Sequence, residues 1–163
     1  MNTNGIRVGL GHDTHRLGPG AALRLGGVDV PHDRAAIGHS DADVLLHAIT
    51  DALLGAAALG DIGELFPDTD ASNRGRDSAE MLAAACRQVR AAGFEIVNVD
   101  CIVHAERPKL SPYKNQIRQR IAEVLGIDFD RVGVKAKTGE TVGPVGRQEA
   151  IEAQCIALIE CPK

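Results

Sequence analysis

The sequence predicts an α+β fold, a mixed α/β two-layer sandwich in which one sheet is covered by about three helices on one face. Apolar residues recur with helical spacing in three segments, 40–59, 77–92 and 111–125. Apolar extended segments occur at 6–10, 94–104, 131–137 and 149–159. The last two extended segments are joined by a loop too short for a parallel crossover, so the sheet cannot be wholly parallel. A length of 163 residues suits one domain, residues 1–163.

The composition is that of a globular protein, with 44% apolar and 25% charged residues. A formal charge of -4 provides no basic field for nucleic acid, and an aromatic content of 2% leaves little to stack on bases. We therefore expect neither a nucleic acid polymer nor a membrane as a partner. An anionic small molecule would have to be held locally, by a metal, by backbone N–H groups and by a few placed basic side chains.

The N-terminal residues lack the features of a signal or transit peptide, so we expect a cytoplasmic protein of bacterial type. The four cysteines have no CxxC spacing. They are therefore interpreted as small core residues rather than as metal ligands or disulfide partners.

The first extended segment, 6–10, leads into the sequence His-Asp-Thr-His at 12–15. If the strand continues, Asp13 and His15 point to the same side. A carboxylate and an imidazole on one face can ligate a cation such as Zn²⁺. A polar turn or a simple Asp–His pair is the alternative interpretation of this short motif.

Next along the chain, residues 22–30 have the pattern of a hairpin that turns at Gly26-Gly27, and 31–38 is expected to be a loop. The helix that follows is predicted to begin at Ser40 or Asp41, which are good N-cap residues, and to stop at Gly60.

His47 lies on the edge of the apolar stripe of this helix, four positions from Asp43 and from Asp51. It is either a core histidine satisfied by one of these carboxylates or a metal ligand, and the spacing alone leaves both open. After the helix, the Gly- and Asp-rich loop 60–70 offers carboxylates that could bind the hydroxyl groups of a sugar or polyol. A solvated acidic loop is equally compatible with that composition.

The second helix, 77–92, is expected to be capped by Asp77, and it shows no chemical motif. The strand 94–104 leads into the loop 104–110, where a base or sugar could meet backbone amides. Ser111 and Pro112 begin the third helix. The glycine-rich loop 137–147 places Lys137, a hydroxyl, a carboxylate and Arg147 together, a set that could hold phosphates directly and through Mg²⁺. A hairpin tip is the alternative.

Four segments taken together resemble the 2-C-methyl-D-erythritol 2,4-cyclodiphosphate synthases of the non-mevalonate pathway of isoprene biosynthesis. They are GHDTHRL at 11–17, the block from GHSDAD to FPDTD at 38–70, AERPKL at 105–110, and VKAKTGE through GR at 134–147. The match covers nearly the whole chain in the family's order. It implies a phosphorus–oxygen lyase that converts 4-diphosphocytidyl-2-C-methyl-D-erythritol 2-phosphate to the cyclodiphosphate and CMP. The 2-phosphate would attack the β-phosphate, with metal assistance and without a protein nucleophile.

The resemblance also implies the site. Asp13, His15 and His47 would bind Zn²⁺ or a similar divalent metal, and Glu140 would bind a second cation, Mg²⁺ or Mn²⁺, between the phosphates. His39 and Thr138 would be catalytic, as stabilisers of the transition state, and Asp51 would at most orient His47. The residues implied to bind the substrate are Asp13, Thr14, His15, His39, Ser40, Asp61, Ile62, Gly63, Phe66, Pro67, Asp68, Thr69, Asp70, Ala105, Glu106, Arg107, Pro108, Lys109, Leu110, Ser111, Lys137, Thr138, Gly139, Glu140, Pro144 and Arg147.

The family assembles as a homotrimer with active sites between subunits, so the same assembly is expected here. The chain departs from the family after Ala136, where members often carry a run of threonines and this sequence has Lys137-Thr138-Gly139. Two alternatives stay open: a noncatalytic, metal-dependent cytidine-nucleotide-binding module, and a hydrolytic metalloenzyme that would use a metal-bound water.

Overall fold

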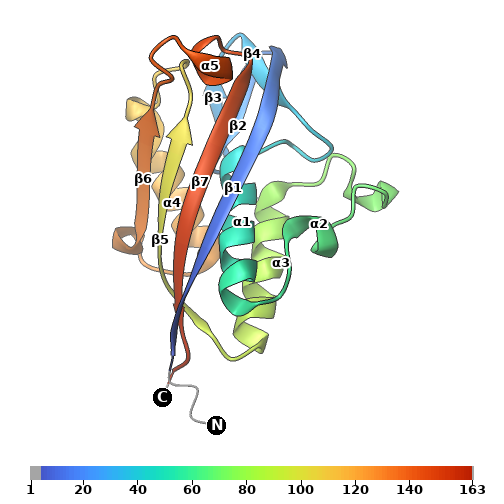
Figure 1. Cartoon of the computed structure of the whole chain (residues 1–163), viewed down its shortest axis with the longest axis vertical. Coiled ribbons are helices and arrows are strands. Elements are labelled where there is room, and N and C mark those ends of the chain that lie inside the picture. The colour runs from blue at the N-terminus through green and yellow to red at the C-terminus, as the bar shows by residue number, and fades with distance from the viewer. Residues whose placement is uncertain (1–4, 163) are drawn as a thin grey trace.

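The structure is a computed structural model that describes residues 5–162. Its main sheet has five strands in the order β4-β1-β7-β5-β6 (Figure 1). The strands are β1 (Ile6–Pro19), β4 (Arg34–Ile37), β5 (Glu95–His104), β6 (Val132–Lys137) and β7 (Ala150–Glu160). Every neighbouring pair is antiparallel except β5 and β6, which are parallel. The predicted mixed sheet is therefore confirmed.

Three long helices accompany this sheet: α1 (Val44–Ala57), α3 (Ser78–Ala91) and α4 (Lys114–Leu125). In Figure 1, β5, β7 and β1 pass in front of α4 and α1, so the helices lie on one side of the sheet. A separate hairpin consists of β2 (Ala22–Leu25) and β3 (Val28–Pro31), as predicted. The remaining elements are short: α2 (Ile62–Leu65), α5 (Gly143–Gly146), and 3-10 turns at Ala71–Asn73, Ser111–Tyr113 and Phe129–Arg131.

The first strand is longer than predicted. It continues through the whole His-Asp-Thr-His segment and pairs with β7 from Ile6 to Arg16. Part of the loop expected at 31–38 is strand β4, which pairs with the end of β1. The hairpin-tip interpretation of 137–147 is wrong, because β5 lies between β6 and β7 in the sheet. After β6 the chain therefore crosses over β5 to form β7. The position of β7 depends on long-range strand pairing and not on the length of the loop.

Helix α1 begins later and ends earlier than predicted. Ala42 adopts a left-handed backbone with φ of 56°, which keeps residues 40–42 out of the helix. Asp43 is the N-cap instead, and its carboxylate accepts the N–H of Leu46 at 3.0 Å. At the other end, Ala58 takes the left-handed conformation that terminates the helix, two residues before Gly60.

Close contact between β1 and α1 depends on glycine. A Cβ atom on Gly9 would overlap the carbonyl oxygen of Ala52, and one on Gly11 would overlap that of Ala48. The strand therefore lies against the bare backbone of the helix. Because Asp13 and His15 follow Gly11 on the same face of the strand, this contact brings them beside α1.

The opposite face of the sheet is apolar at one end and has no covering element within residues 5–162. Its exposed side chains include Ile6 and Leu10, each 69% exposed, Val8, 64% exposed, and Ile156, 51% exposed. We call these four residues the outer apolar face. Among residues 5–162, no helix has the length and apolar character needed to cross a membrane.

Candidate active site

The structure brings Asp13, His15 and His47 together at the junction of β1 and α1. Asp13 Oδ2 lies 3.1 Å from His15 Nε2 and 3.0 Å from His47 Nδ1, and the two imidazole nitrogens are 3.1 Å apart. All three side chains are partly buried, with 12% to 27% of each exposed. One oxygen and two nitrogens thus form a nearly equilateral triangle that opens toward solvent.

This triangle fits a divalent metal. Zn²⁺ takes three protein ligands of this kind and keeps a fourth position open, and the edges of its tetrahedron are about 3.3 Å long. Burial alone would raise the pKa of Asp13, but hydrogen bonds and charge from His15 and His47 outweigh it and hold that pKa well below the ordinary value. The carboxylate is therefore ionised and available as a ligand.

The second nitrogen of the His47 ring faces two hydroxyl groups. His47 Nε2 lies 2.8 Å from Ser78 Oγ and 3.1 Å from Ser40 Oγ. Asp51, which the sequence made a candidate orienting partner, has a different role: its carboxylate accepts the N–H of Ile62 at 2.8 Å and so holds the start of α2. Ser78 was missed because its only local signal was its place in the first turn of a helix without a chemical motif.

Asp43, four residues before His47, is also not a metal ligand. Its carboxylate is fully buried and accepts three backbone N–H groups, from Gly26 at 2.9 Å, Gly27 at 2.7 Å and Leu46 at 3.0 Å. The first two donors belong to the turn of the β2–β3 hairpin. Asp43 thus ties that hairpin to the start of the helix that carries His47.

A cavity of about 590 Å³ lies between the approach to α1 and the loop after α2. Its lining residues are Ile37, Gly38, His39, Asp68, Thr69, Asp70, Ala71 and Arg74. The structure therefore places His39 with three predicted residues of the 66–70 segment. It does not place Asp61 or Gly63 in this lining. Asp61 instead caps α2, accepting the N–H of Glu64 at 2.9 Å.

The loop after α2, which lines this cavity, is held in place by contacts between its own residues. Asn73, which is buried, donates its side-chain amide to the carbonyl oxygen of Pro67 at 2.9 Å. The guanidinium of Arg76 lies over the Phe66 ring at 4.8 Å from its centroid. Phe66 and Pro67 thus support the loop.

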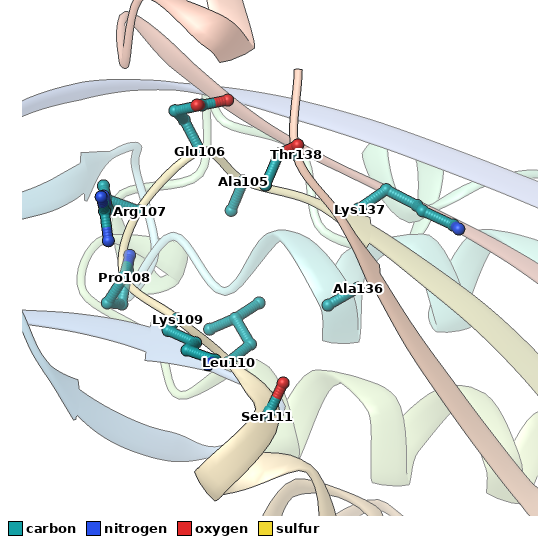
Figure 2. Close-up of a pocket in the computed structure, with 10 residues that line it drawn as sticks. All are labelled: Ala105, Glu106, Arg107, Pro108, Lys109, Leu110, Ser111, Ala136, Lys137 and Thr138. Atoms are coloured by element: carbon teal, nitrogen blue, oxygen red, sulfur yellow. The ribbon is translucent and has the colours of Figure 1, made fainter. Parts of the chain in front are cut away.

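A second cavity, of about 360 Å³, lies where β5 and β6 end (Figure 2). It is lined by Ala105, Glu106, Arg107, Pro108, Lys109, Leu110, Ser111, Ala136, Lys137 and Thr138. These are the two segments for which the sequence predicted contact with a nucleotide, and parallel pairing of His104 with Lys137 brings them together. Figure 2 shows the 105–111 loop curving around one side of the cavity while residues 136–138 form the other.

The two sides of this cavity are joined by Glu106. Its carboxylate accepts the N–H of Gly139 at 3.0 Å and that of Thr141 at 3.5 Å. Thr138 Oγ1 donates to Glu140 Oε1 at 3.0 Å, so the predicted catalytic hydroxyl and the predicted cation ligand are neighbours. Arg147 instead pairs with Glu149, with both nitrogen–oxygen distances at 3.0 Å. Neither Pro144 nor Arg147 lines the second cavity.

Within the part of the chain that the structure describes, the metal cluster and the second cavity share no lining residue. His39 and Thr138, both predicted to be catalytic, line different cavities. One chain therefore presents two groups of site residues on separate parts of its surface.

Comparison with known proteins gives one consistent result. Residues 6–160 match the YgbB family. The 2-C-methyl-D-erythritol 2,4-cyclodiphosphate synthase of Rhodopirellula baltica is 55% identical over 94% of this chain and 93% of its own length. The synthase of Chromobacterium violaceum is 58% identical over 94% of this chain and 98% of its own length. The CDP complex of IspF from Plasmodium falciparum superposes with a TM-score of 0.87 at 36% identity, over 98% of this chain and 99% of that one.

Proposed function

The chain belongs to the YgbB family, and on that premise we propose how its residues form 2-C-methyl-D-erythritol 2,4-cyclodiphosphate, the product for which its relatives are named. An oxygen of the substrate's 2-phosphate attacks the β-phosphorus of the diphosphocytidyl group. The bond from that phosphorus to the bridging oxygen breaks, and CMP leaves with the oxygen. Because the nucleophile is already an anion, the protein's task is to align it and to balance charge. The observation that carries this assignment is the Asp13–His15–His47 triangle, found on a chain whose relatives are named as synthases of this product.

Asp13, His15 and His47 are proposed to hold Zn²⁺, and Glu140 to hold Mg²⁺ or Mn²⁺. Such cations supply positive charge to phosphate oxygens during transfer. The chain's own contribution is to fix the three donor atoms about 3 Å apart before any metal binds, which reduces the conformational entropy lost on binding.

His39 and Thr138 are proposed to donate hydrogen bonds to phosphate oxygens as negative charge shifts between them. Both side chains are exposed and so can reach a ligand. The cavity that contains His39 is proposed to take the methylerythritol part, whose hydroxyl groups suit the carboxylates of Asp68 and Asp70. Asp61 and Gly63 are proposed to contribute from the neighbouring turn.

The second cavity is proposed to take the cytidine nucleotide. Lys109 and Lys137 lie at its edge and offer positive charge to an otherwise acidic protein. The backbone of residues 105–111 and 137–140 offers N–H and C=O groups that can read a pyrimidine edge. The CDP complex of the Plasmodium falciparum relative supports a nucleotide ligand for this fold.

The active enzyme is proposed to be a homotrimer in the cytoplasm, each subunit a single domain of residues 1–163. Two observations support the assembly. The outer apolar face leaves four large side chains at least half exposed. The two groups of site residues share no lining residue in one chain, so a neighbouring subunit can complete each site.

The experiment that tests this function is product analysis. Purified protein with Zn²⁺ and Mg²⁺ should convert the diphosphocytidyl substrate to CMP and a cyclic diphosphate, identified by phosphorus NMR. Binding of CDP or CMP without turnover would instead favour the noncatalytic module. An open phosphate product would indicate hydrolysis. Unreacted substrate under all metal conditions would refute the synthase assignment.

A further inference from the structure

Helix α3 carries a serine hydroxyl that lies against the proposed metal ligand His47. Ser78 is fully buried in the first turn of α3, and its Oγ lies 2.8 Å from His47 Nε2. On its other side, Ser78 Oγ donates a hydrogen bond to Asp41 Oδ1. A chain of hydrogen bonds therefore connects the metal cluster, His47, Ser78 and Asp41.

The direction of each hydrogen bond in this chain follows from the number of available protons. An ionised carboxylate is only an acceptor, so Asp41 takes the single hydroxyl proton of Ser78. Ser78 Oγ can then only accept from His47, so in a neutral His47 ring, the form that ligates a metal, the hydrogen is on Nε2. The lone pair of Nδ1 is left free, and Nδ1 is the atom that lies 3.0 Å from Asp13 Oδ2 and 3.1 Å from His15 Nε2.

Asp41 is itself held in place by several groups. Its Oδ2 accepts the backbone N–H of Ser78 at 3.2 Å, and the Arg24 guanidinium lies 3.7 Å from the same oxygen. Its Oδ1 accepts the backbone N–H of Asp43 at 3.3 Å. The carboxylate thus joins the start of α3 to the approach to α1, and its position leaves Ser78 little freedom to turn.

We propose that Ser78, with Asp41 behind it, is a positioning pair that directs Nδ1 of His47 toward the metal and fixes the orientation of the ring. The inference rests on the proposed metal site. Outer partners of this kind orient histidine ligands and make them more basic, and their loss typically weakens metal affinity by about 10- to 100-fold. Ser40 Oγ is the other hydroxyl near Nε2, but it lies farther away, at 3.1 Å, and accepts the N–H of Ala42.

The test compares Ser78→Ala with the wild-type protein by two measurements. One is the dissociation constant for Zn²⁺, from competition with a chromophoric chelator. The other is the exchange rate with water of the His47 Nε2 hydrogen, from proton NMR of zinc-loaded, histidine-labelled protein. We expect Ser78→Ala to bind Zn²⁺ about 10- to 100-fold more weakly and to exchange this hydrogen faster. Ser78→Thr, which keeps a hydroxyl, should restore much of both.

The matched control is Thr50→Val. Thr50 is also fully buried, lies three residues after His47 on the same helix, and donates its hydroxyl to the carbonyl oxygen of Leu46 at 2.8 Å. Thr50 does not contact the metal cluster. The zinc affinity of Thr50→Val and the exchange rate of its His47 Nε2 hydrogen should therefore match those of the wild type. If Ser78→Ala fails to fold, Asp41→Asn provides the second variant. It keeps the serine but removes the charged acceptor, and it should shift both measurements in the same direction.

Two outcomes would overturn the proposal in distinguishable ways. If folded Ser78→Ala binds Zn²⁺ with wild-type affinity and keeps a slowly exchanging Nε2 hydrogen, while His47→Ala loses affinity, the positioning role is wrong and the metal site stands. If His47→Ala itself binds Zn²⁺ as the wild type does, the proposed metal site is wrong, and the role of Ser78 is wrong with it.

Discussion

Gly11 on β1 lies so close to Ala48 on α1 that a Cβ atom on the glycine would overlap the carbonyl oxygen of the alanine. The same Cβ would lie 2.7 Å from the amide nitrogen of Ala52. Both obstacles are backbone atoms of a buried helix, so neither can move aside at low cost. The contact sets how near Asp13 and His15 come to His47.

Gly11→Ala should therefore damage stability and metal binding together. We expect the free energy of unfolding to fall by about 3 kcal/mol or more, at the upper end of overpacking effects, and zinc affinity to fall with it. Chemical denaturation and chelator competition measure the two. Gly55→Ala is the control, because Gly55 lies on the exposed side of α1 with nothing within 4 Å of a new Cβ. It should stabilise the helix by about 0.5–1 kcal/mol. Unchanged zinc affinity in Gly11→Ala would contradict the expectation.

Asp43→Ala should destabilise the protein more than the loss of an ordinary helix cap. The substitution leaves three backbone N–H groups without their acceptor, and each such group costs about 1–3 kcal/mol when buried. We expect the free energy of unfolding to fall by about 3 kcal/mol or more. Asp77→Ala is the comparison, because Asp77 accepts a single N–H, from Ala79 at 2.8 Å, and should cost about 1 kcal/mol. If urea denaturation gave equal losses of unfolding free energy for Asp43→Ala and Asp77→Ala, the contact of Asp43 with the hairpin would add nothing to stability.

Glu106→Ala should weaken nucleotide binding without affecting the metal cluster. Removing the carboxylate frees Gly139 and Thr141, so the two sides of the second cavity lose their side-chain connection and keep only the backbone hydrogen bond from Ala105 to Lys137. The loss of about 1–1.5 kcal/mol corresponds to a roughly 5- to 10-fold rise in the dissociation constant for CDP, measured by titration calorimetry. Zinc affinity should stay at the wild-type value. Glu123→Ala, at an exposed position of α4, is the control. A variant that bound CDP normally would remove this role from Glu106.

Leu10→Asp should prevent the proposed assembly. Leu10 is 69% exposed on the outer apolar face, and a charge there would be buried without a partner in a trimer. We expect sedimentation to show monomers that have lost synthase activity but still bind Zn²⁺, since the cluster lies within one chain. Leu59→Asp, on an exposed residue after α1, should leave the assembly intact. A variant that remained trimeric would exclude this face as the interface.

Thiol reactivity should show one accessible cysteine per chain. Cys86, Cys101 and Cys155 are buried, and Cys161 is only partly so. Burial raises the pKa of the Cys86 thiol to about 11. The pKa of the Cys101 thiol is also raised, mainly by a hydrogen bond with Cys155 and in addition by burial. At pH 8 the Cys86 thiolate is therefore about a thousandth of the population. A chromogenic disulfide should react quickly with one thiol in the native protein and with four in denaturant.

The same pKa shift has a consequence for stability. Because the folded pKa of Cys86 lies above its ordinary value of 9.0, ionisation favours the unfolded chain. The contribution of the protonated Cys86 thiol to the free energy of unfolding is complete below about pH 9 and is lost as the pH rises toward 11. In Cys86→Ala this part of the alkaline decline in unfolding free energy should be absent. An identical decline in both proteins would contradict the shift.

Local patterns in the sequence predicted most helices and strands well but did not predict which strands lie side by side in the sheet. The helices near 77–92 and 111–125 and the hairpin at 22–30 follow from caps, spacing and the Gly26-Gly27 turn, and all are present. The position of β7 between β1 and β5 depends on pairings across the whole chain, and no loop length encodes it. The start of α1 at Asp43 depends on a left-handed Ala42, a conformation that alanine rarely adopts.

The candidate site was predictable only in part, because local patterns identify residue types but not which residues meet in space. Residue types marked Asp13, His15 and His47 as possible ligands, yet only the resemblance joined them, because spacing along a chain does not determine distance in space. Asp51, one turn from His47, was expected at most to orient it, and its carboxylate instead accepts the N–H of Ile62. Ser78 approaches His47 from a different helix, so no pattern within either segment could have connected the two.

The long ladder between β1 and β7 has a topological consequence. Ile6 is paired with Glu160, and the N–H of Cys161 donates to the carbonyl oxygen of Gly5 at 3.4 Å, so the described chain nearly closes into a ring (Figure 1). Asp13 and His15 lie seven or more positions farther along that ladder. A circular permutant that joins residues 5 and 162 through a short linker and is opened at the exposed Gly93 should therefore fold with its metal ligands in place, since Gly93 bonds only to Arg90 at the end of α3 and lies far along the chain from Ser78.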